Sequence, residues 1–296
     1  MRCRYRENIY KCGEFLEVDI FPTFDKKKGG RIARRSRFRE TSGMQARLNQ
    51  RNAEKALVRL LNANFTTGDI EIALTYDNEH LPSKYEDAVR DVTNYLRRVK
   101  RMRDKLGLPE MKRVTVPGAG RFHFHIVMSG GVPREILETL WGKGFANSRR
   151  LEANRDGFAG IANYIAAQLD PDMNTDDLFS AYDINEETGE LTERDGHKAN
   201  RAKNAKRFTC SNNIVRPEPE IKDGRISQKK VEELATVSSA SAKEFNKIYD
   251  GYEFVRCEPY YNSEYGGWYI HVRMRKRDER KRRSEGVARR QNYNEF

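Results

Sequence analysis

Cysteine is scarce in this chain of 296 residues, and long apolar runs are absent. The four cysteines (Cys3, Cys12, Cys210 and Cys257) form neither a CxxC pair nor a zinc-finger spacing, so we expect reduced thiols. No run of about 18 apolar residues is available to cross a bilayer, and the N-terminus lacks the apolar core of a signal peptide. The sequence therefore predicts a soluble, cytoplasmic protein with no membrane partner.

Acidic residues are too few to balance the basic ones, because 56 Lys and Arg stand against 44 Asp and Glu and give a net charge of +12. Such a surplus favours a polyanionic partner, and nucleic acid is the leading candidate. Basic runs are commonly solvated faces or tails, but those of this chain lie beside Tyr and Phe residues, which suits phosphate contacts with base stacking. The candidate DNA-binding residues are Arg31, Arg34, Arg35, Arg37, Arg97, Arg98, Arg101, Arg121 and Arg207.

Histidine is also rare, yet two of the five histidines fall in one apolar segment, Arg121-Phe122-His123-Phe124-His125-Ile126-Val127-Met128. Side chains alternate between the faces of a strand, so His123 and His125 share one face while Phe122, Phe124 and Ile126 take the other. A pair of histidines on an arbitrary strand is more often surface decoration than a ligand pair. Within an apolar strand, however, an unpaired polar ring would be costly, and neutral imidazole is the commonest metal ligand. The pair is therefore a candidate metal site.

Hydrophobic periodicity predicts the main elements. Strands are expected over 14–22 and 70–76, around 145–149, 252–257 and 267–274, and as a hairpin over 112–128 with its turn at 117–120. Helices are expected over 43–62, from 83 to 106 with a capping box of Ser83 and Glu86, from Pro133 through Leu140, over 157–169 and around 228–248. Tyr164 borders the apolar stripe of the helix over 157–169, a position where a tyrosine is usually a core-edge residue.

Three of these segments follow one another in a distinctive order: a strand ending Leu74-Thr75-Tyr76, the strand with the two histidines, and the helix with Ile161-Ala162-Asn163-Tyr164. This order and spacing resemble the HUH endonucleases, specifically the rolling-circle replication initiators of phages and plasmids from Gram-positive bacteria. Further similarity covers Ser129-Gly130-Gly131, Gly144-Phe145-Ala146-Asn147 and Arg207-Phe208-Thr209-Cys210-Ser211-Asn212-Asn213. The resemblance extends over most of residues 70–215.

The resemblance implies a metal-assisted reaction on DNA. His123 and His125 would bind Mg²⁺ or Mn²⁺, and Tyr164 would attack single-stranded or hairpin origin DNA to leave a 5′-phosphotyrosine and a free 3′-OH. A phenol is protonated at neutral pH and is a poor nucleophile, so it needs a cation to stabilise the developing charge. The covalent bond retains the energy of the broken phosphodiester and allows rejoining without ATP. Because the 3′-OH would prime a polymerase, a host helicase and polymerase are further candidate partners.

The chain departs from the family pattern at the expected third metal ligand. Relatives usually carry this ligand, often Glu, on the strand before the histidines, but no residue from Lys112 to Arg121 is acidic. Water, Glu110 or a group near the first strand such as Asp77 are the candidates for its place.

A second departure follows the tyrosine. Relatives commonly have a lysine three or four residues later, whereas this chain has Ala167 and Gln168. Gln168 lies one turn beyond Tyr164 on the same helix face and is the catalytic candidate at that place. The two departures leave a second hypothesis open, a DNA protein that binds the origin without cutting it. A relaxase or a single-tyrosine transposase ranks lower, because relaxases usually have three clustered histidines and those transposases are generally much shorter.

Together these patterns predict an α+β fold with a central, mainly antiparallel sheet and flanking helices, as in HUH initiators, followed by a C-terminal α+β extension. We expect the histidines on one face, helices packed on the other, and Tyr164 presented over the metal. The expected parts are an N-terminal strand and basic arm (1–40), an HUH-like catalytic domain (41–170), a linker (171–206), a C-terminal α+β accessory region (207–275) and a basic tail (276–296).

Overall fold

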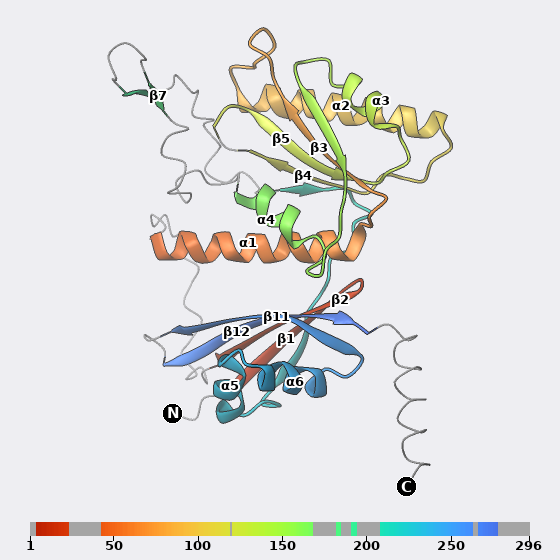
Figure 1. Ribbon diagram of the computed structural model, residues 1–296. Coiled ribbons are helices and arrows are strands. Elements are labelled where there is room, and N and C mark those ends of the chain that lie inside the picture. Colours follow the sequence, from red (N-terminus) through yellow and green to blue (C-terminus); the bar gives the residue numbers. More distant parts are fainter. Residues whose placement is uncertain are drawn as a thin grey trace, which may run out of the picture. The chain divides into compact units, whose positions relative to one another are not determined.

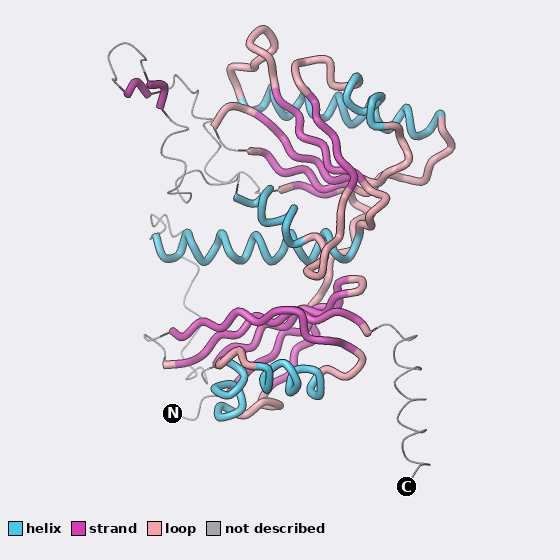
Figure 2. Tube along the Cα trace, in the orientation of Figure 1, coloured by secondary structure: helices cyan, strands magenta, loops and turns pink. Residues whose placement is uncertain are grey.

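The computed structural model describes residues 4–23, 43–118, 120–167, 182–184, 191–193, 208–262 and 266–277, and these form two compact units. Unit 1 combines residues 1–39 with 216–296, and unit 2 comprises residues 40–215. Each unit has its own five-stranded antiparallel sheet with helices, as Figures 1 and 2 show. The fold is therefore α+β, as the sequence predicts.

The sheet of unit 2 has the strand order β6-β3-β5-β4-β9, which puts the strand with the two histidines at its centre. The strands are β3 (Ile70–Thr75), β4 (Arg113–Pro117), β5 (His123–Met128), β6 (Ala146–Arg150) and β9 (Thr209–Cys210). The predicted hairpin is confirmed: β4 and β5 pair antiparallel, and the backbone N–H of Gly118 donates to the carbonyl of His123 at 2.9 Å. A central strand has hydrogen-bonded neighbours on both sides, so it holds its side chains rigidly.

Helices cover both faces of this sheet. α2 (Tyr85–Lys105) and α3 (Arg134–Thr139) pack on the face that carries Ile72 and Ile126, whereas α1 (Gly43–Asn64) and α4 (Ala159–Ala167) pack on the face that carries Val116 and Val127 (Figure 1). The expected packing of helices opposite the histidines is confirmed for α2 and α3, and α1 additionally covers the histidine face together with the helix of Tyr164. The histidine face also bears apolar residues on β4 and β5, and these need cover from water.

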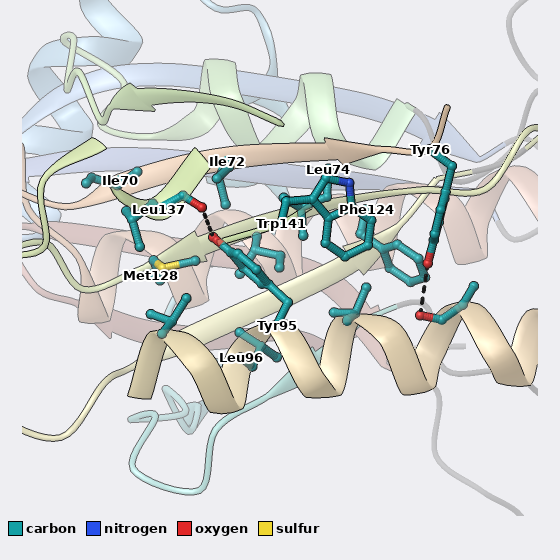
Figure 3. Close-up of a cluster of buried hydrophobic side chains, with 14 of the residues drawn as sticks. Ile70, Ile72, Leu74, Tyr76, Tyr95, Leu96, Phe124, Met128, Leu137 and Trp141 are labelled. Carbon is teal, nitrogen blue, oxygen red and sulfur yellow. Dashed lines mark hydrogen bonds between the residues drawn. The ribbon is translucent and has the colours of Figure 1, made fainter. Parts of the chain in front are cut away.

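Aromatic residues anchor the α2 face, as Figure 3 shows. The buried Tyr95 hydroxyl donates to the carbonyl of Leu137 at 3.2 Å, and the indole N–H of Trp141 donates to the carbonyl of Thr75 at 2.7 Å. The rings of Tyr76 and Tyr95 meet Trp141 edge-on, with centres 5.1 and 5.9 Å away. These contacts fix β3 and α3 to one core and so hold in place the residues on the opposite face of the sheet.

The predicted capping box at the start of α2 is not formed. The helix begins at Tyr85, and its N-cap is Lys84 in an extended conformation without a side-chain cap hydrogen bond. Ser83 therefore lies one residue too early to cap this helix. Glu86 and Asp87 in the first turn instead place negative charge near the positive end of the helix dipole.

The sheet of unit 1 joins the two ends of the chain in the order β10-β1-β2-β12-β11. Its strands are β1 (Arg4–Cys12), β2 (Phe15–Thr23), β10 (Glu220–Asp223), β11 (Tyr252–Asn262) and β12 (Gly267–Lys276), with helices α5 (Gln228–Ala235) and α6 (Ser239–Ile248). Within its core, the buried Glu7 accepts hydrogen bonds from Tyr249 at 2.7 Å and from Arg225. The carboxylate thus keeps strong donors although water is excluded.

The units differ from the expected parts at both ends. The segment 1–40, expected as one strand and an arm, contributes two strands that pair with strands from the C-terminal region. The start of the expected accessory region, 207–275, contributes β9 to the sheet of unit 2. Most of the expected linker and the tail lie outside the described residues, apart from the short hairpin of β7 (Tyr182–Ile184) and β8 (Leu191–Glu193). Among the described helices, none is long and apolar enough to cross a membrane.

Candidate functional site

The two histidines of β5 lie on the same face of the sheet. Their ring centres are 5.4 Å apart, with the ring planes at 85°. At this separation the two imidazoles would be the residues that hold a shared metal ion. His125 is buried and His123 is partly exposed, which leaves the pair reachable from one side.

Glu71 on β3 orients His125. The Nδ1 atom of His125 lies 2.8 Å from Oε1 of Glu71, whose side chain is 3% exposed. A carboxylate can only accept, so Nδ1 carries the proton and Nε2 keeps the lone pair that a metal needs. A carboxylate behind a histidine in this way is the usual support of a metal-binding imidazole. Glu71 is not among the residues predicted from the sequence.

Arg149 on β6 connects this carboxylate to the tyrosine. Its Nε donates to Oε2 of Glu71 at 2.9 Å, and its guanidinium carbon lies 5.4 Å from the centre of the Tyr164 ring. The register explains the contact, because Glu71 and Arg149 are directly paired residues of β3 and β6. The side chain of Arg149 is 55% exposed, so its guanidinium also faces solvent.

α4 brings Tyr164 to the histidines. The ring centres of Tyr164 and His125 are 5.7 Å apart, in an edge-on arrangement. Ala162, Ile165 and Ala166 of α4 are buried, whereas Tyr164 stands at the border of that buried face and is 51% exposed. The structure thus brings together the three residues that the sequence selects, His123, His125 and Tyr164.

The surroundings of His123 favour its neutral form. Burial lowers its pKa below the usual value of 6.5 and outweighs the opposite effect of the hydrogen bond from Nδ1 to the carbonyl of Arg121 at 2.9 Å, and His125 lowers it a little further. The neutral ring is the form that binds metals. Gly118 gives the ring its space, because a β carbon there would lie 1.9 Å from Nε2. The predicted turn contains this glycine, but the sequence does not show that it contacts His123.

Among the described residues, no acidic side chain adds a third metal ligand to the two histidines. Asp77 binds His80 instead, with its two carboxylate oxygens 2.8 and 2.9 Å from Nδ1. Glu110 lines a cavity on the α2 face of the sheet, opposite the histidines. Across the part of the chain that the structure describes, no group of three His, Cys, Asp or Glu could hold a metal ion. The protein donors at the site are therefore the two imidazoles.

Comparison with known proteins adds no relative. No family model, curated protein or solved structure matches the chain.

The predicted DNA-binding arginines do not gather at this site. Arg31, Arg34, Arg35, Arg37 and Arg207 lie outside the described residues, as does the catalytic candidate Gln168. Arg97, Arg98 and Arg101 belong to α2, on the face of the sheet opposite the histidines.

Two of the predicted arginines, Arg98 and Arg121, donate hydrogen bonds to backbone carbonyls. Arg98 donates from Nε to the carbonyl of Leu140 at 2.9 Å and from Nη2 to that of Trp141 at 3.2 Å, so it fixes the end of α3. Arg121 lies next to the histidine strand and donates from Nη2 to the carbonyl of Tyr76 at 3.0 Å. Of the predicted arginines that the structure describes, Arg121 is the one that adjoins His123.

Proposed function

We propose that unit 2 is a metal-dependent endonuclease that nicks and rejoins single-stranded origin DNA to initiate rolling-circle replication. The observation that carries the proposal is the phenol of Tyr164 beside two imidazoles, one of which is held by the buried Glu71. A nucleophile next to oriented metal ligands is the arrangement that phosphodiester exchange needs.

The reaction exchanges one phosphate ester for another. The hydroxyl oxygen of Tyr164 attacks the scissile phosphorus, an O–P bond to the tyrosine forms, and the bond from phosphorus to the 3′ oxygen breaks. The phenolic proton passes to solvent, and the departing 3′ oxygen takes up a proton to become a 3′-OH. Attack by a 3′-OH on the phosphotyrosine reverses these steps, so joining needs neither an oxidant nor ATP.

The residues around Tyr164 have separate roles in this proposal. His123 and His125 would hold Mg²⁺ or Mn²⁺, which supplies Lewis-acid stabilisation of the charge on the phosphate. Glu71 keeps the His125 ring in position. Arg149 uses Nε for Glu71, and because its two Nη groups donate to no described residue, they are available to a DNA phosphate beside Tyr164.

The test is a denaturing gel of the purified chain with labelled single-stranded DNA from its own replicon, with and without Mn²⁺. We expect a metal-dependent protein–DNA adduct that is lost in Tyr164→Phe. Tyr260→Phe is the matched control, because Tyr260 of unit 1 is also 51% exposed. We expect this control to form the adduct as the wild type does.

Two results would overturn the proposal. Salt-dependent binding of the DNA without an adduct, with or without Mn²⁺, would show an origin-binding protein that does not cut. An adduct that persists in Tyr164→Phe would place the nucleophile elsewhere in the chain.

A further inference from the structure

A second site lies in unit 2, on the α2 face of the sheet. A cavity of about 720 Å³ opens between α2 and the edge formed by β4 and β9. The packing of the helix accounts for it, because α2 buries its apolar residues mainly against β3 and β5 and leaves part of β4 uncovered. The volume falls within the range of small-molecule binding sites, about 300–1,000 Å³. The sheet separates this cavity from His123, His125 and Tyr164.

The lining of the cavity combines apolar residues, here called the apolar wall, with charged residues that are mainly basic, here called the basic wall. The apolar wall includes Tyr85, Val92, Leu96, Met111 and the buried Phe124. The charged residues of the lining are Arg97, Lys100, Arg103 and Arg113 against Asp104 and Glu110, so four basic residues face two acidic ones. This lining suits a ligand with a negatively charged part and a flat apolar part.

Arg113 is the lining residue that indicates a bound anion. Its guanidinium is partly buried and donates to the hydroxyl of Thr115 at 3.3 Å, and no described carboxylate lies within ion-pair distance. Arg103 differs, because it donates to the carbonyls of Pro109, Ser129 and Gly130 and is fully used in the fold. A partly buried cation without a counter-ion gains strongly from a bound anion. The guanidinium fork matches phosphate in particular.

We propose that this cavity binds a nucleoside phosphate unit, with its phosphate on Arg113 and its base against the apolar wall near Phe124. Inorganic phosphate alone would leave most of the volume and the whole apolar wall unused. A nucleoside phosphate uses both walls. The unit is either a free nucleotide or one residue of a single strand. The proposal goes beyond the nicking site and shares no residue with it.

The experiment measures binding of three ligands to the full chain by fluorescence anisotropy and competition: labelled dAMP, a labelled dT oligomer, and unlabelled inorganic phosphate as competitor. We expect Arg113→Gln to weaken nucleotide binding by about tenfold or more, the usual effect of losing a charged hydrogen bond. Lys100→Gln removes a cavity cation at an exposed helix position, which cannot disturb the sheet, and should also weaken binding. Arg90→Gln on α2 lies outside the cavity and should not change it.

The outcomes distinguish a free nucleotide from one residue of a single strand. Binding of dAMP that depends on Arg113 identifies a free nucleotide, whereas binding of the oligomer alone with the same dependence identifies a strand residue. The proposal is overturned if neither ligand binds, if Arg113→Gln binds normally, or if inorganic phosphate competes as well as dAMP. Tyr164→Phe should bind the nucleotide as the wild type does, so failure of the nicking proposal remains distinguishable.

Discussion

Replacing Glu71 by Gln tests the arrangement behind His125. The carboxylate accepts one hydrogen bond from Nδ1 of His125 at 2.8 Å and one from Nε of Arg149 at 2.9 Å. Glutamine keeps the shape of the side chain but offers one oxygen and one NH₂ group. Because NH₂ cannot accept, one of the two donors loses its partner, and the negative charge behind the imidazole disappears.

The size of the effect follows from burial. A buried hydrogen bond to a charged group contributes about 1.5–3 kcal/mol. The pair with Arg149 contributes less, about 0–1 kcal/mol, because the arginine side chain is 55% exposed. Both contributions are reduced because the negative charge is lost to both donors, so we expect Glu71→Gln to lower the free energy of unfolding of unit 2 by about 1.5–4 kcal/mol. The affinity for Mn²⁺ should fall by about 10–100-fold, as when other carboxylate supports of metal-binding histidines are removed.

Urea unfolding followed by Trp141 fluorescence measures the first effect. The chain has two tryptophans, so a Trp268→Phe background leaves Trp141, in the core of unit 2, as the reporter. Glu152→Gln is the control, because Glu152 is exposed in a loop and its change should stay within about 0.5 kcal/mol. Electron paramagnetic resonance of free Mn²⁺ gives the affinity. If Glu71→Gln matches the control in both measurements, Glu71 does not hold His125 and the reasoning is refuted.

Three further predictions concern Gly118, His123 and Tyr249. Gly118→Ala should weaken Mn²⁺ binding, because its β carbon would lie 1.9 Å from Nε2 of His123. Gly160→Ala is the control and should leave the affinity for Mn²⁺ unchanged, because the nearest atom to its added carbon is 4.0 Å away. Since burial lowers the pKa of His123 below 6.5, the unfolded chain takes up its proton first, so the free energy of unfolding should fall as pH drops below 6.5. Urea titrations of His123→Gln should show a shallower fall over that range, and an unchanged slope would contradict the assignment. Tyr249→Phe removes a donor to the buried Glu7 and should lower the free energy of unfolding of unit 1 by about 1.5–3 kcal/mol, measured by urea unfolding with Trp268 fluorescence. A change under about 0.5 kcal/mol would mean that Glu7 keeps enough donors without Tyr249.

Local sequence patterns account for the elements of unit 2 and for the shared face of the two histidines. The alternation around His123 and His125 fixes their common direction, and helical spacing places Tyr164 at the border of a buried stripe. Both are properties of neighbouring residues in the chain. The approach of Tyr164 to His125 additionally needs α4 to pack on the histidine face, which no local pattern states.

The supporting residues depend on strand register and could not be predicted. The alternation in β3 shows that Glu71 and Ile72 face opposite ways, but the contact of Glu71 with His125 depends on the pairing of Ala73 with His125. The contact with Arg149 depends in the same way on the pairing of β3 with β6. Unit 1 shows the same effect over a longer distance, because β2 pairs with β12 about 250 residues later in the chain. Pairing at such separations is set by burial and topology of the whole fold, not by local propensity.

The arginines of unit 2 lie on both faces of its sheet, so they cannot all contact DNA bound at one site. From composition alone, all basic clusters are equal candidates for a DNA surface. In the structure, Arg121 and Arg149 lie on the side of the histidines, whereas Arg97, Arg101 and Arg113 are associated with α2 and its cavity. Under the proposed function, a phosphate at Tyr164 would lie near Arg149, whose guanidinium carbon is 5.4 Å from the tyrosine ring centre, and the sheet would separate it from the α2 group. If both proposals hold, the arginines of unit 2 would bind phosphate on two opposite faces of the sheet, and a DNA strand at Tyr164 would leave the α2 cations free for another phosphate.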